Sequence, residues 1–489
     1  MQSIPNYWYL CRILLILAKN TPGMRKFLAL LLALACAGAQ AQEKGPVNVE
    51  AREWSKTHPE KTSWKMYPSV TVDMLPSAPS APDRLNRYGS LADGPQLEGT
   101  GFYRTCKYNG RWFFVDPEGR LHIDAGVVGI RQGGGETNKR SFAEKFADKQ
   151  DWILKTGKQI ASWGFNGAGA WSDDEAIRLH NRLVPEMQMS YCPFLGLMSG
   201  YGWQKKVARQ LSGNTGYPNQ CILAFDPGFE EFCEKKIAQA VARYKDDPNV
   251  LGYFSDNEMP LSKKNLEGYL DLPEDDFGRK AAEEWLRGKG IARDGITDEL
   301  REEFAGFVAE RYYSVVSKIL KKYDPDHLYL GTRLHGGAKY IRPVYEAAGR
   351  WCDVISINYY GFWRVREKDV ERWQEWADKP FIITEFYTKA EDSGLSNVTG
   401  AGWLVHTQKD RGIHYENFII GLLGTRNCIG WSWFKYQDND PTAKNVDPSN
   451  LNSNKGCFDN RYEPYEDLVR SMTRVNTVRY GLVFDFNGK

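Results

Sequence analysis

Two glutamates lie at the ends of short apolar runs. LGYFSDNE (251–258) ends at Glu258, and FIITEF (381–386) places Glu385 one residue before its end. Each run has the length and apolar character of a buried strand in a parallel sheet, which would bring each glutamate to the strand's carboxyl end. Two carboxyl groups facing each other across one site are what hydrolysis of a glycosidic bond requires. These two residues are the first candidates for catalysis.

Eight apolar segments alternate with helical patterns after residue 120. The predicted strands lie within 121–130, 165–171, 189–196, 250–258, 328–335, 353–361, 381–387 and 429–438. The clearest helical patterns cover 230–245, 304–323, 415–424 and 465–475. This alternation predicts an α/β protein with a closed (β/α)8 TIM barrel, whose active site lies at the carboxyl ends of the strands. An open doubly wound sheet would usually carry a Gly-rich phosphate loop after its first strand, and GGGE (133–136) lacks that spacing.

Three regions are expected along the 489 residues. Residues 1–41 comprise an upstream extension and, from Met24, a signal peptide with a basic start, an apolar stretch and small residues before the cleavage point. Residues 42–100 are rich in Pro, Ser and charge, which predicts an extended segment. The catalytic (β/α)8 domain then covers 101–489. It begins with a β-hairpin at 101–120, turning at Asn109-Gly110, that would cap the bottom of the barrel.

Composition narrows the choice of partners. Removal of 1–41 changes the formal net charge from +2 to −2, because four basic residues leave and no acidic one does, so no nucleic-acid partner is expected. The signal peptide predicts a periplasmic or extracellular protein, because its apolar stretch after Met24 is too short to span a membrane. Cys36 is a candidate lipidation site, so a lipid anchor is an alternative. No Cys/His spacing indicates a metal site, no cofactor is expected, and the oligomeric state is left open.

Polar and aromatic side chains gather where the strands should end. Beside the two glutamates, the candidate substrate-binding residues are Asn257, Arg333, His335, Asn358, Tyr359, Tyr360, Trp171 and Trp433. A single polar residue at such a place often only caps the next helix. Convergence from several strands favours a site that binds a polysaccharide or oligosaccharide, since aromatic rings suit the faces of sugars.

The neighbours of the two glutamates suggest different roles for them. Tyr359 or Tyr360 would donate to Glu385 and hold its pKa low, as a nucleophile needs. A neighbouring negative charge would raise the pKa of Glu258 so that it can donate a proton. Asn257 would hydrogen-bond the sugar 2-hydroxyl, and Trp433 would form a floor under the sugar ring.

Several longer stretches resemble known enzymes. Asn-Glu after the fourth strand, Glu on the seventh and Trp on the eighth are similar to clan A of the retaining glycosidases. DPNVLGYFSDNE (247–258), KKYDPDHLYLGTR (321–333), DVISINYY (353–360), KPFIITEFY (379–387) and IGWSWFKYQD (429–438) resemble glycoside hydrolase family 50, whose known members are mainly exo-acting β-agarases. The resemblance implies attack by Glu385, protonation by Glu258 and cleavage of β-1,4 galactosidic bonds in agarose. A sizeable N-terminal carbohydrate-binding-like domain is common in that family, but we expect none between the leader and the barrel, because only residues 42–100 lie there.

Two alternatives follow from the same residues. The chain could hydrolyse another β-linked polysaccharide, as a mannanase or β-galactosidase of the same clan does. It could also be a non-catalytic barrel that only binds glycans, although such barrels usually lose one of the two carboxylates.

Overall fold

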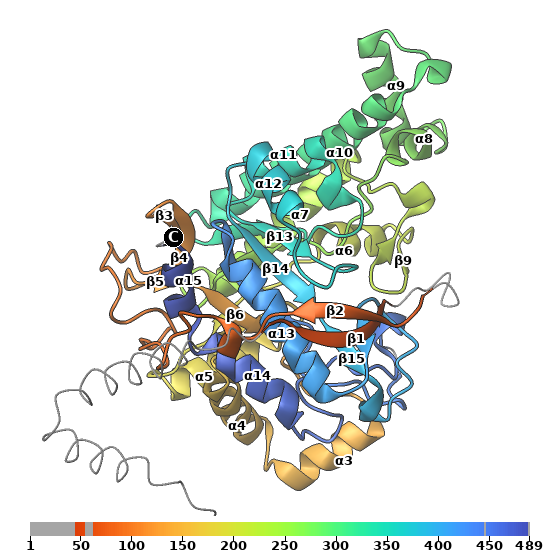
Figure 1. The fold of residues 1–489 in the computed structure, drawn as a ribbon. Coiled ribbons are helices and arrows are strands. Elements are labelled where there is room, and N and C mark those ends of the chain that lie inside the picture. The colour runs from red at the N-terminus through yellow and green to blue at the C-terminus, as the bar shows by residue number, and fades with distance from the viewer. Residues whose placement is uncertain (1–44, 54–61, 445, 488–489) are drawn as a thin grey trace, which may run out of the picture. The chain divides into compact units, whose positions relative to one another are not determined.

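The computed structural model describes residues 45–53, 62–444 and 446–487. Residues Val47–Lys489 form one compact unit (Figure 1). The predicted leader at 1–41 lies outside the described residues. Within the described ranges, no helix is both long enough and apolar enough to cross a membrane.

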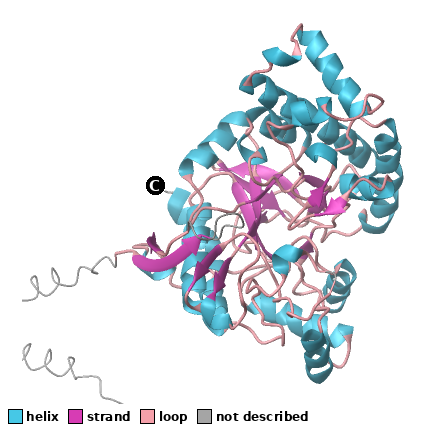
Figure 2. Ribbon diagram, turned by 90° about the vertical axis from the view of Figure 1, so that its right-hand side faces the viewer, coloured by secondary structure: helices cyan, strands magenta, loops and turns pink. Residues whose placement is uncertain are grey.

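Eight short parallel strands form the centre of this unit. They are β6 (Asp124–Val127), β7 (Gly167–Ala168), β8 (Ser190–Tyr191), β11 (Gly252–Phe254), β12 (Leu328–Gly331), β13 (Ile355–Asn358), β14 (Phe381–Phe386) and β17 (Cys428–Trp433). Each overlaps one of the eight predicted segments. Figure 2 shows these central strands with helices around them. The protein therefore has the predicted α/β class.

The strands do not form one continuous closed ladder, which differs from the predicted barrel. Six of them pair in the order β13-β14-β17-β6-β7-β8, and β11 pairs with β12 separately. Single parallel bridges lie in the two gaps: Tyr191 with Val250 and Phe194 with Phe254 on one side, and Leu334 with Ile357 on the other. Pro193, which follows β8, weakens the ladder at the first gap, because proline lacks an N–H donor.

Helices follow most of the central strands, and the four predicted helical patterns coincide with α7, α10, α13 and α14. The helices are α3 (Glu136–Lys145), α4 (Lys149–Ser162), α5 (Asp174–Leu183), α6 (Leu197–Gln204), α7 (Pro227–Tyr244), α8 (Asn265–Leu270), α9 (Phe277–Lys289), α10 (Asp298–Tyr323), α11 (Arg342–Trp351), α12 (Glu367–Trp376), α13 (Gln408–Leu423), α14 (Glu466–Asn476) and α15 (Arg479–Asn487). Helix α13 begins before its predicted start, because Thr407 and Asp410 form a reciprocal capping box.

The predicted hairpin at 101–120 is present as β3 (Arg104–Tyr108) and β4 (Arg111–Val115), which continues to β5 (Leu121–His122). Asn109 and Gly110 take φ of 48° and 75°, the left-handed conformation that a tight hairpin turn needs. Tyr103 and Phe114 share a buried cluster with residues such as Leu328, near the amino ends of the central strands. The hairpin therefore packs at the end opposite the two glutamates.

A second sheet holds the chain that leaves β14. Strands β1 (Val47–Glu53) and β2 (Lys65–Ser69) come from the region predicted to be only extended, and no strand was predicted there. They join β15 (Thr388–Ala390) and β16 (Trp403–Val405) in the order β15-β16-β1-β2. Val49, Ala51 and Trp403 are among the residues of their small buried core. This sheet anchors the segment directly after Glu385.

Candidate active site

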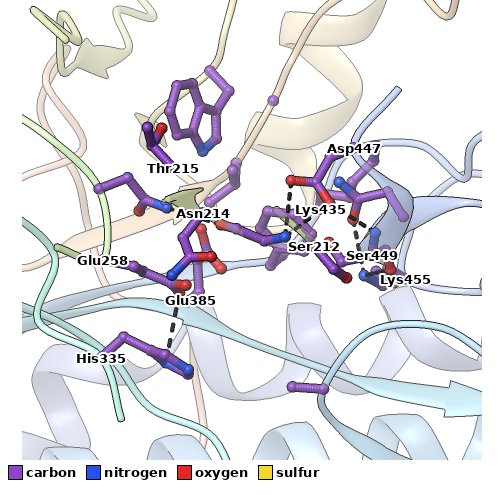
Figure 3. Close-up of a pocket in the computed structure, with 18 of the residues that line it drawn as sticks. Ser212, Asn214, Thr215, Glu258, His335, Glu385, Lys435, Asp447, Ser449 and Lys455 are labelled. Carbon is purple, nitrogen blue, oxygen red and sulfur yellow. Dashed lines mark hydrogen bonds and ion pairs between the residues drawn. The ribbon is translucent and has the colours of Figure 1, made fainter. Parts of the chain in front are cut away.

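A cavity of about 390 Å³ lies at the carboxyl ends of the central strands (Figure 3). Six of the sequence-predicted site residues line it: Trp171, Asn257, Glu258, His335, Tyr360 and Glu385. Two more, Arg333 and Asn358, contact the glutamates directly. The structure thus brings together residues that lie on or just after five different strands and are up to 214 positions apart, from Trp171 to Glu385.

Glu385, on β14, is held by two donors. Its Oε1 accepts a hydrogen bond from Arg333 Nη2 at 2.6 Å, and its Oε2 accepts one from Tyr360 Oη at 2.7 Å. Burial raises the pKa of Glu385, while the Arg333 charge and the Tyr360 hydroxyl favour its ionised form. The Tyr360 hydroxyl lowers this pKa, as predicted for a tyrosine, but the net shift is upward because desolvation outweighs the hydrogen bond.

Arg333 bonds both to Glu385 and to Asn257, the residue directly before Glu258. The Arg333 side chain is fully buried, and the residue, two positions beyond β12, has a φ of 54°. Nη1 donates to Asn257 Oδ1 at 2.9 Å, and Nη2 also donates to the Thr384 carbonyl at 3.2 Å. A buried guanidinium needs such partners, since an unpaired charge in the interior is costly. The arginine therefore fixes the side chain of Glu385 relative to the strand that leads to Glu258.

Glu258 has neutral hydrogen-bond partners instead. It lies four residues beyond β11 with a φ of 48°, and its backbone N–H bonds the Thr332 carbonyl at 3.1 Å. Asn358 Nδ2 donates to Glu258 Oε1 at 2.7 Å, and Thr384 Oγ1 orients that amide by donating to Asn358 Oδ1 at 2.7 Å. His335 Nδ1 lies 3.5 Å from the same carboxyl oxygen.

Burial raises the pKa of Glu258 to about 7. The Asn358 hydrogen bond and the charge of Arg333 act in the opposite direction. The predicted raised pKa is present, but its main cause is not the predicted negative neighbour: the charge of Asp447 contributes less than desolvation does. Glu258 is therefore half protonated near neutral pH, which suits a group that both gives and takes a proton.

Two predicted substrate-binding residues lie elsewhere. Tyr359 points to the helices and donates its hydroxyl to Asp369 Oδ2 at 2.7 Å, because successive residues of an extended chain point to opposite sides. Trp433 is fully buried against Phe386, and its Nε1 donates to the Lys455 carbonyl at 3.0 Å. Neither lines the cavity, so the predicted sugar floor at Trp433 is wrong.

No individual site residue was predicted in the part of the cavity formed by two loops. One carries β9 (Arg209–Gln210) and β10 (Thr215–Gly216), and the other follows β17. They meet where Asp447 Oδ1 accepts a hydrogen bond from the Gly213 N–H at 3.0 Å. Lys435, Lys455, Tyr387 and Trp203 also line the cavity. The loops lack periodicity, although Tyr387 is the last residue of the predicted strand 381–387 and Lys435 lies within the predicted strand 429–438.

The chemistry available here is acid–base and nucleophilic chemistry by carboxyl groups. Among the described residues, no group of three or more His, Cys, Asp or Glu side chains is placed to hold a metal ion. Two buried carboxyl groups with unequal partners in one cavity match what glycoside hydrolysis needs.

Comparisons with known proteins agree with this chemistry. No family model matches the chain. The sequence is 26% identical to Beta-agarase B of Vibrio sp. (strain JT0107) over 531 residues, covering 88% of this chain and 53% of that protein. It is 32% identical to Beta-agarase A of the same strain over 386 residues, covering 69% of this chain and 37% of that protein. The chain thus spans about half, or less, of the length of these curated relatives.

Solved structures show the same relationship. The crystal structure of BpGH50 superposes with a TM-score of 0.79 at 32% identity, covering 92% of this chain and 98% of that one. An exo-beta-agarase superposes with a TM-score of 0.69 at 20% identity, covering 84% and 68% of the two chains, which shows a shared fold. The high identity to BpGH50 over nearly its whole length establishes that the chain belongs to glycoside hydrolase family 50.

Proposed function

We propose that the protein hydrolyses β-1,4 galactosidic bonds of agarose or a related galactan by double displacement, with retention of configuration. Glu385 is the nucleophile and Glu258 the acid/base. The observation that carries this proposal is the unequal pair of carboxyl groups in one cavity: Arg333 contacts Glu385 at 2.6 Å, whereas Glu258 has a pKa of about 7.

The steps follow from these surroundings. Glu258 protonates the glycosidic oxygen while Glu385 attacks the anomeric carbon, so the leaving sugar departs and a glycosyl ester forms on Glu385. Glu258, now ionised, takes a proton from water, which attacks the same carbon and releases Glu385. Arg333 stabilises the ionised Glu385 at the start and end of this cycle. Asn257 and Trp171, which line the cavity, are the proposed contacts to the sugar.

Agarose is the proposed substrate because the matched relatives are β-agarases. The aromatic lining of the cavity, which includes Trp171, Trp203 and Tyr387, suits the apolar faces of galactose rings.

We also propose that residues 101–489 form the catalytic domain and that its strands close into the (β/α)8 barrel of clan A. The parallel bridges in both ladder gaps support this closure. Export through the leader at 1–41 is part of the same proposal.

Digestion of defined agaro-oligosaccharides followed by proton NMR tests the mechanism. The first-formed reducing end should be the β-anomer, and an initial α-anomer would exclude double displacement. Chromatography of digests of agarose, carrageenan, porphyran and mannan then tests the substrate. Products from mannan alone would favour the alternative hydrolase, and binding without any product would favour a glycan-binding protein.

A further inference from the structure

The side of the cavity away from Glu258 and His335 is basic. Arg131, Lys435 and Lys455, here called the basic wall, all line it. Figure 3 shows Lys435 and Lys455 on the side opposite Glu258 and His335. Lys435 lies two residues beyond β17, and Lys455 lies near the end of the loop that begins there. The proposed cleavage of a neutral sugar makes no use of these positive charges.

The two lysines bond to neutral atoms only. Lys455 Nζ donates to the Ser449 carbonyl at 2.6 Å and to Asn450 Oδ1 at 2.8 Å, and Lys435 Nζ donates to Asn439 Oδ1 at 2.6 Å. In the part of the chain that the structure describes, neither ammonium group forms an ion pair with a carboxylate. Most other lysine contacts to side-chain oxygen in the fold are ion pairs, such as Lys205 with Asp226.

These charges are costly where they lie. Lys455 is 2% exposed, and burial lowers its pKa well below the usual range, helped by the charges of Lys389 and Lys435. Burial lowers the pKa of Lys435 to about 7, with Arg131 acting in the same direction. A buried cation without a counter-charge loses stability, and an anion in the cavity would restore both charges.

Asp447 attracts both lysines without neutralising them, while Asp438 also attracts Lys435 and Glu385 also attracts Lys455. The Asp447 carboxylate accepts hydrogen bonds from the backbone N–H groups of Gly213 and Ser449, and from Gln210 Nε2 at 3.2 Å. Its oxygen atoms are therefore occupied in holding the two loops together. In the described part of the chain, none of these carboxylates forms an ion pair with Lys435 or Lys455, so each ammonium group lacks a direct counter-charge when it is protonated.

The basic wall lies close to the bond that would be cleaved. Lys455 Nζ is 4.7 Å from the centre of the Tyr387 ring, and that ring is 5.4 Å from the Tyr360 ring. Tyr360 in turn donates to Glu385. A sugar held for attack by Glu385 would therefore bring its substituents, or those of the adjacent sugar, to Lys455.

We propose that the cavity takes an acidic galactan unit, in which a sulfate ester or a carboxylate substituent binds Lys435 and Lys455 while Glu385 and Glu258 cleave the neighbouring glycosidic bond. This inference rests on the proposed function and narrows its substrate class. Sulfate and carboxylate share the negatively charged oxygens that ammonium groups bind, so separate substrates must distinguish them.

The test compares three oligosaccharides of equal length: a neutral agaro-oligosaccharide, one with a 6-sulfated galactose and one with a pyruvate-ketal galactose. The enzyme should show a higher kcat/KM on one of the charged substrates. Lys435→Met should lower that kcat/KM by about tenfold to a hundredfold, the effect of losing a hydrogen bond between charged groups, and leave the neutral substrate within about twofold. Lys435→Arg should retain most of the preference. Lys444→Met, an exposed lysine on the same loop, is the matched control and should change nothing.

The inference would be overturned if kcat/KM were equal on all three substrates. It would also be overturned if Lys435→Met lowered kcat/KM equally on the neutral and the charged substrates. Either result would leave the proposed hydrolysis standing. If no galactan is cleaved, the proposed function fails, and calorimetry with galactose 6-sulfate and with its pyruvate-ketal counterpart still tests the basic wall. Binding of either sugar that weakens in Lys435→Met and in Lys455→Met supports it, and no binding of either refutes it. Thermal melting separates loss of folding in the buried Lys455 variant from loss of binding.

Discussion

Glu385 and Glu258 share one cavity and are both shielded from water, but their neighbours differ in charge. Glu385 accepts hydrogen bonds from a buried guanidinium and a tyrosine hydroxyl, and Glu258 from an amide, with a histidine nearby. Burial alone raises both pKa values. The comparison teaches that the charged partner, and not the depth of burial, distinguishes the residue suited to be an ionised nucleophile from the one suited to hold a proton.

The largest test of this difference is Glu385→Gln. Because the amide cannot attack the anomeric carbon, kcat on agaro-oligosaccharides should fall on the order of 10⁵-fold, as for other lost nucleophiles. Glu391→Gln, an exposed glutamate on the loop after the same strand, is the control and should retain full activity. Turnover above about 1% of wild type in Glu385→Gln, far more than a missing nucleophile permits, would reverse the assignment.

Glu258→Gln should have a smaller effect that depends on the leaving group. Loss of a general acid should lower kcat by about 10²- to 10⁴-fold on a natural oligosaccharide. Formation of the glycosyl ester should recover on an aryl galactoside whose leaving group needs no proton, and a burst of released phenol would measure this step. An equal loss on both substrates would mean that Glu258 does not donate the proton.

The pH dependence of kcat/KM tests the role of Glu258 in the wild-type enzyme. Because Glu258 must be protonated to donate and has a pKa of about 7, kcat/KM should be high below neutral pH and fall about tenfold per unit above it. Initial rates from pH 5 to 9 measure this decrease in kcat/KM. The residual activity of Glu258→Gln should not show this decrease above neutral pH. If the decrease persisted in that variant, a group other than Glu258 would cause it.

Two adjacent tyrosines give the smallest and most selective comparison. Tyr360→Phe removes a hydrogen bond to Glu385 and should lower kcat by about tenfold, the cost of losing one bond to a charged group. Tyr359→Phe removes the bond to Asp369, so it should leave kcat unchanged and cost about 1 kcal/mol of unfolding free energy. Steady-state kinetics and urea unfolding of both variants would show the contrast. Similar kinetics in the two would remove Tyr360 from the site.

The eight strand segments, the hairpin at Asn109-Gly110 and the two glutamates could be predicted because each depends on a local pattern. An apolar run of strand length is buried wherever it lies, and Asn-Gly forms its turn from backbone preference alone. Strand β1 escaped prediction because it is stabilised by pairing with residues more than 300 positions away, such as Arg52 with Leu404, and β2 is the edge strand that pairs with β1.

Side-chain direction was harder to predict than position. The β13–β14 ladder shifts register between Ile357 and Asn358, so counting along the sequence could not show which of the two tyrosines that follow would face the cavity. Trp433 was misplaced for a related reason: it lies at a strand end, but its ring packs between the strands and α13.

The sequence by itself determined the α/β class, the order of its strands and the presence of a carboxyl group at the ends of two of them, because hydrophobic periodicity and turn residues act locally. Only the tertiary structure decided what surrounds each carboxyl group. Arg333 reaches Glu385 across 52 residues, and the basic wall comes from loops with no periodic pattern. The energies that set a pKa or bind a charge depend on distance in space and on burial, and neither is written in the local sequence.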